Sequence, residues 1–72
     1  MPVGRSQYVY VNLPAAGTEA RVEVVNALGA VVSMERATGM TAEVKAPATA
    51  GVYVVRVVID GKAASYAKLV VE

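Results

Sequence analysis

The 72-residue chain contains no cysteine, histidine, tryptophan or phenylalanine, and Asp60 is its only aspartate. Without cysteine and histidine, a zinc site lacks its usual ligands, and neither a Ser-His-Asp nor a Cys-His catalytic arrangement can be assembled. The lack of cysteine also excludes the disulfides that often hold small secreted domains together. We therefore expect a protein that is not an enzyme and that binds no metal or cofactor.

Charged residues are few and scattered. The chain carries 7 basic and 6 acidic residues and a net charge of +1. No basic patch interleaves with aromatic residues, so we expect no nucleic-acid partner. The five glutamates are dispersed along the chain, and we expect them to face solvent: Glu19, Glu23, Glu35, Glu43 and Glu72. The six glycines form neither a Gly-x-Gly-x-x-Gly motif nor a phosphate loop.

Long hydrophobic runs are also missing. No apolar stretch reaches the roughly 18 residues of a membrane-spanning helix, and the first five residues do not resemble a signal peptide, so an exported chain would carry its signal on a longer precursor. By contrast, 56% of the residues are hydrophobic, mainly valine and alanine. A chain this short buries only roughly 60% of the surface of its unfolded form, so we expect exposed apolar surface that meets a partner.

Alternation of apolar and polar residues runs through most of the chain and predicts strands. They are expected at residues 7–13, 19–25, 30–36, 40–46, 52–59 and 62–71, with turns at 14–18, 26–29, 37–39, 47–51 and 60–61. No segment has helical spacing with capping residues. Six or seven short antiparallel strands are typical of a small immunoglobulin-like β-sandwich. We place this domain at residues 7–72, after a flexible N-terminal segment of residues 1–6.

The same alternation predicts which side chains face the core. In residues 19–25, Val22 is expected to face inward and Glu23 to face solvent, and Tyr8 and Tyr10 are expected to share one face. Such an aromatic pair serves packing more often than ligand binding. Residues 40–46 have the clearest pattern, with four side chains expected on the buried face: Met40, Ala42, Val44 and Ala46.

The strongest local signal is the Asp60–Gly61 pair between two valine-rich runs. A type I′ turn needs positive φ at both central residues, which aspartate tolerates and glycine adopts freely. A two-residue turn also fixes the register of its strands. The predicted cross-strand pairs are Ile59–Lys62, Val58–Ala63, Val57–Ala64, Val55–Tyr66 and Tyr53–Lys68. A pairing of Val57 with Ser65 would contradict this register.

Four features occur in order along the chain. They are a valine-rich strand leading into an Asn-x-x-Gly turn (24–32), a Gly-hydrophobic-Tyr segment (50–57), a Gly-Lys turn (60–62) and a closing Lys-hydrophobic run (66–71). In order, spacing and position they resemble the C-terminal sorting domain of cargo proteins of the type IX secretion system (Por secretion system). The resemblance covers about residues 13–72. The Pro-Asn-Pro that commonly opens such domains is absent, and Val11-Asn12-Leu13-Pro14 stands near its place.

The resemblance implies a signal that ends a longer cargo protein. Such a domain crosses the periplasm with its cargo, is recognised by the outer-membrane secretion machinery, and is removed by a surface sortase, which leaves the cargo at the cell surface or secreted. The matching residues of the recognised region are Gly51, Tyr53, Lys68, Leu69, Val70 and Val71. An accessible terminal strand can be captured by strand addition. It can also be exchanged between two copies, so we expect a homodimer by swapping of residues 63–71.

Two other classes of function stay open. One is an immunoglobulin-like adhesion or carbohydrate-binding module, in which Tyr8 and Tyr10 stack on a ligand. The other is a structural domain that stabilises a neighbouring enzyme. The position of the chain in its parent protein separates these classes, because a sorting domain must end the protein whereas a binding module can lie anywhere.

Overall fold

The computed structural model describes residues 2–14, 19–37 and 39–72, and within these ranges the chain has seven strands and no helix. The strands are β1 (Pro2–Val3), β2 (Tyr8–Asn12), β3 (Ala20–Val25), β4 (Val31–Arg36), β5 (Thr41–Lys45), β6 (Gly51–Ile59) and β7 (Lys62–Val71). The all-β prediction is therefore confirmed. Parts of two predicted turns, at residues 15–18 and 38, lie outside the described residues.

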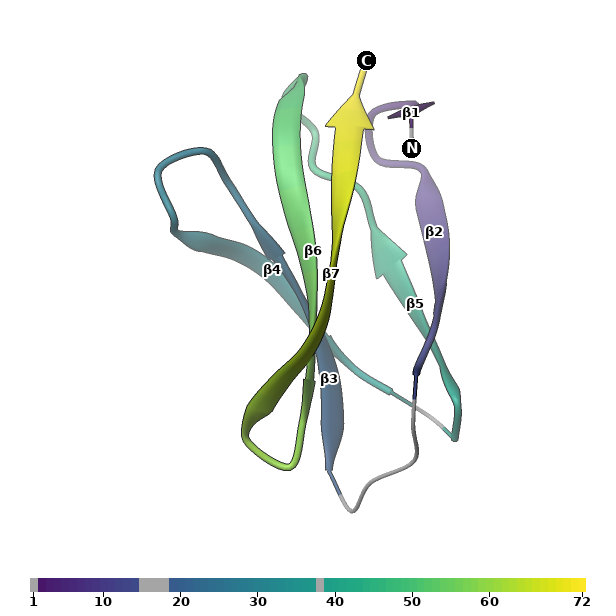
Figure 1. Ribbon diagram of the computed structural model, residues 1–72. Coiled ribbons are helices and arrows are strands. Elements are labelled where there is room, and N and C mark those ends of the chain that lie inside the picture. Colours follow the sequence, from purple (N-terminus) through teal and green to yellow (C-terminus); the bar gives the residue numbers. More distant parts are fainter. Residues whose placement is uncertain (1, 15–18, 38) are drawn as a thin grey trace.

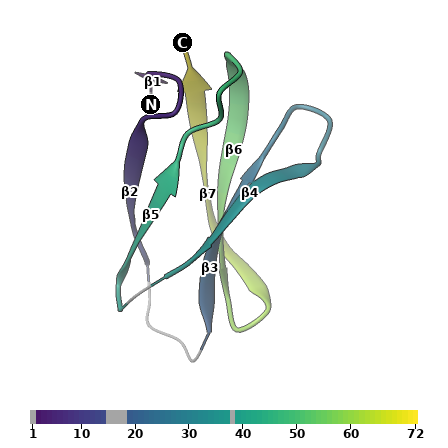
Figure 2. The same cartoon turned by 180° about the vertical axis from the view of Figure 1, so that it is seen from behind.

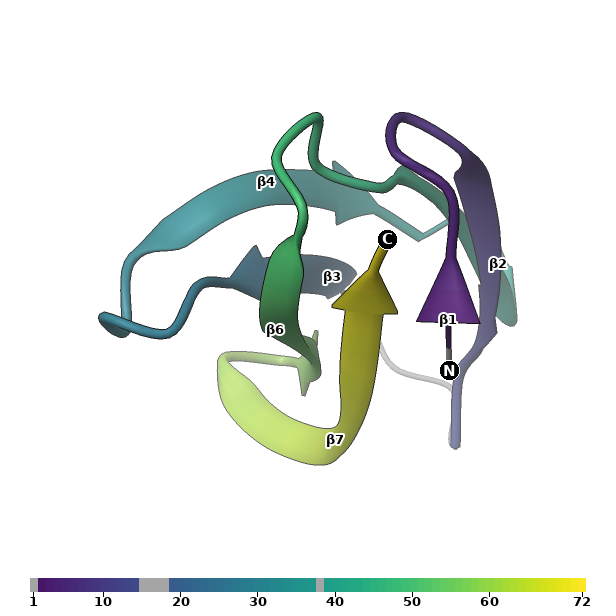
Figure 3. The same ribbon diagram turned by 90° about the horizontal axis from the view of Figure 1, so that it is seen from above.

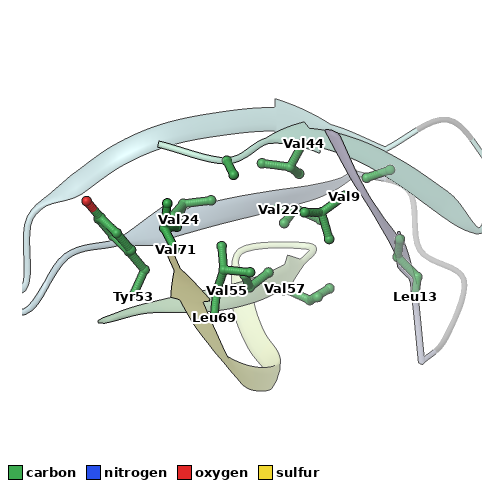
Figure 4. Packing of buried hydrophobic residues seen from close by; sticks show 12 residues of the cluster. Val9, Leu13, Val22, Val24, Val44, Tyr53, Val55, Val57, Leu69 and Val71 are labelled. Atoms are coloured by element: carbon green, nitrogen blue, oxygen red, sulfur yellow. The ribbon is translucent and has the colours of Figure 1, made fainter. Parts of the chain in front are cut away.

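The strands form two sheets, seen from opposite sides in Figures 1 and 2. The larger sheet has the order β1-β7-β6-β3-β4, and the smaller sheet pairs β2 with β5. Their buried apolar side chains meet in one core (Figure 4): Val9, Leu13, Val22, Val24, Ala42, Val44, Ala46, Tyr53, Val55, Val57, Leu69 and Val71. Because both sheets contribute to this core, the arrangement is sandwich-like.

The second sheet follows the predicted alternation with one exception. Ala42, Val44 and Ala46 are buried as predicted, but Met40 is 46% exposed. Met40 directly follows Gly39, whose φ is +65°, and precedes the first strand residue, Thr41. The pleat that sets the alternation therefore starts only after Met40, and the prediction for this residue is wrong.

The C-terminal hairpin has the predicted turn but not the predicted register. Asp60 and Gly61 have φ of +50° and +82°, as a type I′ turn requires. Val58 pairs with Ala63 as expected, but the ladder then shifts and Val57 pairs with Ser65. The predicted register is therefore wrong beyond Val58, because a β-bulge leaves Ala64 as the extra residue of β7.

The bulge decides which side chains of β7 enter the core. In the predicted register, Lys68 is opposite Tyr53, which would place a lysine beside a buried aromatic ring. One extra residue moves every later side chain to the other face of the sheet. Leu69 thus comes opposite Tyr53, and Val71 comes opposite Gly51. Both apolar side chains are buried, and Lys68 is exposed.

A Gly61→Ala substitution is expected to lower the free energy of unfolding by about 1 kcal/mol, because alanine is strained at positive φ. Open space surrounds the Cβ position of Gly61, so the loss would come from the backbone alone. Gly51→Ala is the matched control. It lies outside the positive-φ region and meets only the Tyr53 ring, at an ordinary distance of 3.6 Å. Urea denaturation of both variants measures the difference, and equal losses would contradict the turn assignment.

The predicted Asn-x-x-Gly turn between β3 and β4 is confirmed. The side-chain Oδ1 of Asn26 accepts hydrogen bonds from the backbone N–H groups of Leu28 and Ala30, each at 3.0 Å. Gly29 has a φ of +87°, and its N–H donates to the carbonyl oxygen of Asn26 at 3.0 Å. One asparagine thereby satisfies several backbone groups that would otherwise be left unpaired in the turn.

The N-terminal segment, expected to be flexible over residues 1–6, is paired in part. Pro2 and Val3 form β1, which runs parallel to the end of β7 with Pro2 opposite Val70 and Val3 opposite Val71. Figure 3 shows β1 beside the last part of β7. A parallel partner at the opposite end of the chain leaves no local pattern in the sequence, so this pairing was not predictable from alternation.

Candidate functional site

The β6–β7 pairing brings the six residues of the predicted recognition region together at one end of the larger sheet. Gly51 is opposite Val71, and Tyr53 is opposite Leu69. Lys68 and Val70 lie on the same stretch of β7, opposite Val54 and Val52. The six residues therefore form one contiguous region, although β6 and β7 enter it from different parts of the chain.

The pleat of the strands divides this region between two faces. Tyr53, Leu69 and Val71 point into the core with exposed fractions of 8%, 1% and 2% (Figure 4). The Tyr53 hydroxyl donates a hydrogen bond to the carbonyl oxygen of Thr49 at 2.7 Å, which satisfies its polar atom. These three side chains hold the hairpin on the core, and a protein that docks on the folded domain does not reach them.

The other face of the hairpin carries exposed apolar side chains. Val52, Val54 and Tyr66 are 51%, 37% and 65% exposed, and Val70 is half-buried. We call these four residues the outer patch. Because cross-strand pairing places Val52 beside Val70, the patch is continuous across β6 and β7. Contiguous exposed apolar surface of this kind is typical of a protein-binding face.

A buried carboxylate borders the outer patch. Glu23 is 7% exposed, so its predicted solvent-facing position is wrong. Arg21 Nε donates to Glu23 Oε2 at 2.9 Å, and Arg56 Nε donates to Glu23 Oε1 at 2.7 Å. Hydrogen bonds from Arg21 and from Arg56 hold the pKa of Glu23 below its ordinary value. The two arginines keep this buried group charged and fully hydrogen-bonded, so it adds no unsatisfied polar group to the face.

The outer edge of β7, on the side away from β6, is paired only at its end. Within residues 2–14, 19–37 and 39–72, β1 is the one strand on this edge, and it pairs with Val70 and Val71. The Glu72 N–H also donates to the Val3 carbonyl oxygen at 3.0 Å. Among the described residues, the edge of β7 from Lys62 to Ala67 thus has no strand beside it, whereas the last residues of β7 are covered by β1.

A second candidate surface lies over the smaller sheet. A groove of about 640 Å³ is lined by Tyr8, Tyr10, Ser33, Glu35, Arg36, Thr41, Ala42, Glu43 and Lys45. Tyr8 and Tyr10 are 57% and 74% exposed and share one face as predicted. The hydrogen bond and negative charge of Glu43, the cross-strand partner of Tyr10, raise the pKa of Tyr10 above its ordinary value. Tyr10 therefore stays neutral at physiological pH.

Sequence reasoning missed two features of these surfaces. The first is the cluster of Glu23 with Arg21 and Arg56. The sequence indicated only part of it, because Arg21 and Glu23 are two residues apart and share a strand face. Its other arginine, Arg56, comes from a different strand and could not be assigned without the register. The groove over the smaller sheet needs β4 beside β5, and that arrangement also has no local pattern.

Neither candidate surface has the residues of a metal centre. Within the described parts of the chain, no group of three or more histidine, cysteine or acidic side chains is placed to hold a metal ion. The described residues also contain no helix of the length and apolarity needed to span a membrane. Comparison of the chain with protein-family models, with curated proteins and with solved structures finds no match.

Proposed function

We propose that this chain is a C-terminal sorting domain, an immunoglobulin-like β-sandwich that directs a cargo protein through the type IX secretion system. In this function the domain acts as a docking signal for the outer-membrane machinery and performs no catalysis. A surface sortase then removes it, after passage through the periplasm, and leaves the cargo at the cell surface or released. The proposal rests first on the ordered motifs of residues 13–72 that resemble this class of domain.

One structural observation supports the proposal more than any other. The closing strand β7 lies toward the side of the larger sheet, and no described strand pairs with its outer edge from Lys62 to Ala67. Next to this edge lies the outer patch, whose members Val52 and Tyr66 are more than half exposed. An accessible edge offers backbone hydrogen bonds and an apolar face offers selectivity, which are the two components of recognition by strand addition.

The six matched residues would have two different roles in this proposal, according to their burial. Lys68, Val70 and Gly51 are available to a docking partner, since Lys68 and Gly51 are exposed and Val70 is half-buried. Tyr53, Leu69 and Val71 would contribute by holding the strand in place through the core. Deleting residues 66–72 removes two core side chains as well as the signal, so loss of export in that variant would not separate recognition from folding.

A reporter assay with surface substitutions tests the proposal. An inert reporter is fused before residues 1–72 and expressed in a bacterium that carries type IX machinery, and the amount at the cell surface is measured. We expect the wild-type fusion to reach the surface and the Val52→Ser/Tyr66→Ser variant to fall at least about tenfold. Both side chains are largely exposed, so the variant is expected to keep its fold, which its melting temperature checks.

The matched control changes two exposed tyrosines on the other sheet. Tyr8→Ser/Tyr10→Ser is expected to be delivered like the wild type, because neither residue belongs to the β6–β7 region. A wild-type fusion that stays inside the cell would contradict the proposed function. Equal delivery of the wild-type fusion and of both folded double variants would show that the outer patch has no role in the proposed function.

A second candidate function is an adhesion or carbohydrate-binding module, and the groove over the smaller sheet favours it. Tyr8 and Tyr10 present two neighbouring aromatic rings, and the groove adds two carboxylates, two hydroxyls, a guanidinium and an amine as hydrogen-bonding groups. Such a combination suits a sugar, which stacks its apolar face on an aromatic ring and hydrogen-bonds at its rim. If the Tyr8→Ser/Tyr10→Ser variant lost cell-surface attachment and the Val52→Ser/Tyr66→Ser variant kept it, this function would be preferred.

We also keep the homodimer formed by exchange of residues 63–71 as part of the proposal. Exchange would require the turn at Asp60 and Gly61 to open, because β7 otherwise cannot leave β6 of its own copy. This turn has only two residues with the φ angles of a closed hairpin. A swapped dimer would therefore form slowly, and a concentration-dependent change in sedimentation would detect it.

A further inference from the structure

The first strand of the chain covers the last residues of the final strand. Pro2 lies opposite Val70 and Val3 lies opposite Val71, and the Glu72 N–H donates to the Val3 carbonyl oxygen at 3.0 Å. Figure 3 shows β1 along the side of β7, pointing the same way. The last residues of β7, which belong to the recognised region in the proposed function, are therefore already paired with another segment of the same chain.

This cover is held by few interactions. Its described part has two residues, and Pro2 has no N–H to donate to a ladder. Parallel pairing is also slightly weaker per residue than antiparallel pairing. Val3 is only partly buried against the core and Pro2 is exposed. On its other side β7 pairs with β6 along its whole length, so release of β1 leaves β7 in place.

A tight turn connects the cover to the rest of the domain. The Gln7 N–H donates to the Gly4 carbonyl oxygen at 3.2 Å, and Gly4 N–H donates to Gln7 Oε1 at 2.8 Å. Ser6 within this turn has a φ of +59°, a conformation that residues other than glycine rarely adopt. Beyond the turn, β2 is held by five pairs with β5. The covered state therefore carries local strain at Ser6, and β1 can leave without disturbing β2.

The rows of side chains across the sheet define what fits in place of β1. On the outer face, Val52, Val70 and Pro2 form one row. On the inner face, Gly51, Val71 and Val3 form the next row, and Val3 closes the side of the core. An incoming strand needs a small apolar side chain, of about the size of valine, at the position of Val3. The preceding side chain, at the position of Pro2, extends the apolar row of the outer face.

We infer that β1 is a displaceable cap and that an extended, valine-like segment of the receptor replaces it on the edge of β7. This inference rests on the proposed function, since it names how the same site is opened. Displacement exchanges one short parallel pairing for a longer one. The receptor segment can extend toward the start of β7, where no described strand pairs with the edge from Lys62 to Ala67. The cap thus protects the end of the strand until a partner with more contacts arrives.

A disulfide that locks the cap tests this inference. The chain has no cysteine, and Pro2 and Val70 are directly opposite on neighbouring strands, at a separation of about 5 Å that a disulfide can bridge. In the reporter assay, the oxidised Pro2→Cys/Val70→Cys variant is expected to reach the cell surface at less than about a tenth of the wild-type level. The same double variant kept reduced carries both substitutions without the bond, and it is expected to be delivered at least about tenfold better than the oxidised form. A locked variant delivered like the wild type would overturn the inference and leave the proposed function intact.

Amide hydrogen exchange of the purified domain gives a readout that needs no secretion. We expect the Glu72 amide to exchange at least about tenfold more slowly in the locked variant than in the wild type, and to lose its protection when residues 1–5 are deleted. Amides of β6 are expected to be unchanged in all three proteins. Equal exchange of Glu72 in the locked and wild-type proteins would show that the cap stays closed, which contradicts the inference. This result is independent of whether the reporter is exported.

Discussion

Replacing Leu69 with alanine is expected to lower the free energy of unfolding by about 2–5 kcal/mol and the melting temperature by at least about 10 °C. Leu69 is 1% exposed and pairs with Tyr53 inside the core. Its removal leaves a cavity between the two sheets. The whole stability of a domain of this size is about 4–11 kcal/mol, so the loss is a large fraction of it. Urea and thermal denaturation followed by circular dichroism measure the effect.

The neighbouring residue provides the matched control. Val70→Ala shortens a half-buried side chain on the outer face and is expected to cost less than about 1 kcal/mol. In the straight register predicted from the turn, the two faces would be reversed and Val70 would be the core residue. A larger loss for Val70→Ala than for Leu69→Ala would therefore contradict the bulge at Ala64 and the face assignment that depends on it.

This result also decides how export data on the recognition region are interpreted. If Leu69→Ala unfolds the domain, its failure to export reports the loss of the fold. Substitutions of Val52 or Tyr66 then carry the information about docking, because both side chains are exposed and the core does not depend on them. Melting temperatures of every variant are needed before a residue is assigned a role in recognition.

Local patterns predicted most of the architecture. The alternation that defines β2, β3 and β5 is a property of neighbouring residues, and the two turns at Asn26 and at Asp60 are set by four or five residues each. The three strands and the two turns were confirmed, because side-chain period and turn chemistry act within one segment, but the predicted solvent-facing position of Glu23 in β3 was wrong. Met40, which is exposed and directly precedes the first residue of β5, marks the limit of such patterns.

The remaining features depend on the partner of a strand and were missed for that reason. The bulge at Ala64 arises because the hairpin must place Leu69 in the core, a requirement that the turn alone does not contain. The cap formed by β1 depends on the opposite end of the chain. The burial of Glu23 depends on Arg56, which arrives from β6 in a register that the sequence did not reveal. In all three cases the competing influence is tertiary packing.

Glu23 is the missed residue with the largest expected effect. Its side chain is 9% exposed, whereas those of Arg21 and Arg56 are 41% and 32% exposed. Glu23→Gln keeps the size of the side chain but removes the charge that both arginines contact. We expect the free energy of unfolding at pH 7 to fall by about 1–2 kcal/mol, a modest value because water partly screens the arginines. Glu35→Gln, an exposed glutamate on β4, is expected to change it by less than about 0.5 kcal/mol.

The dependence on pH separates the charge of Glu23 from its packing. Its pKa in the folded state lies below the ordinary value of 4.5, because Arg21 and Arg56 hydrogen-bond the charged form. The carboxylate therefore stabilises the fold fully above that ordinary value, and the stabilisation is lost as the pH falls through the lowered pKa of the folded state. The wild type is expected to exceed Glu23→Gln in stability at pH 7 and to approach it near pH 3. Urea denaturation at both pH values measures this convergence. A difference that stays constant down to pH 3 would mean that the two arginines do not stabilise the ionised carboxylate.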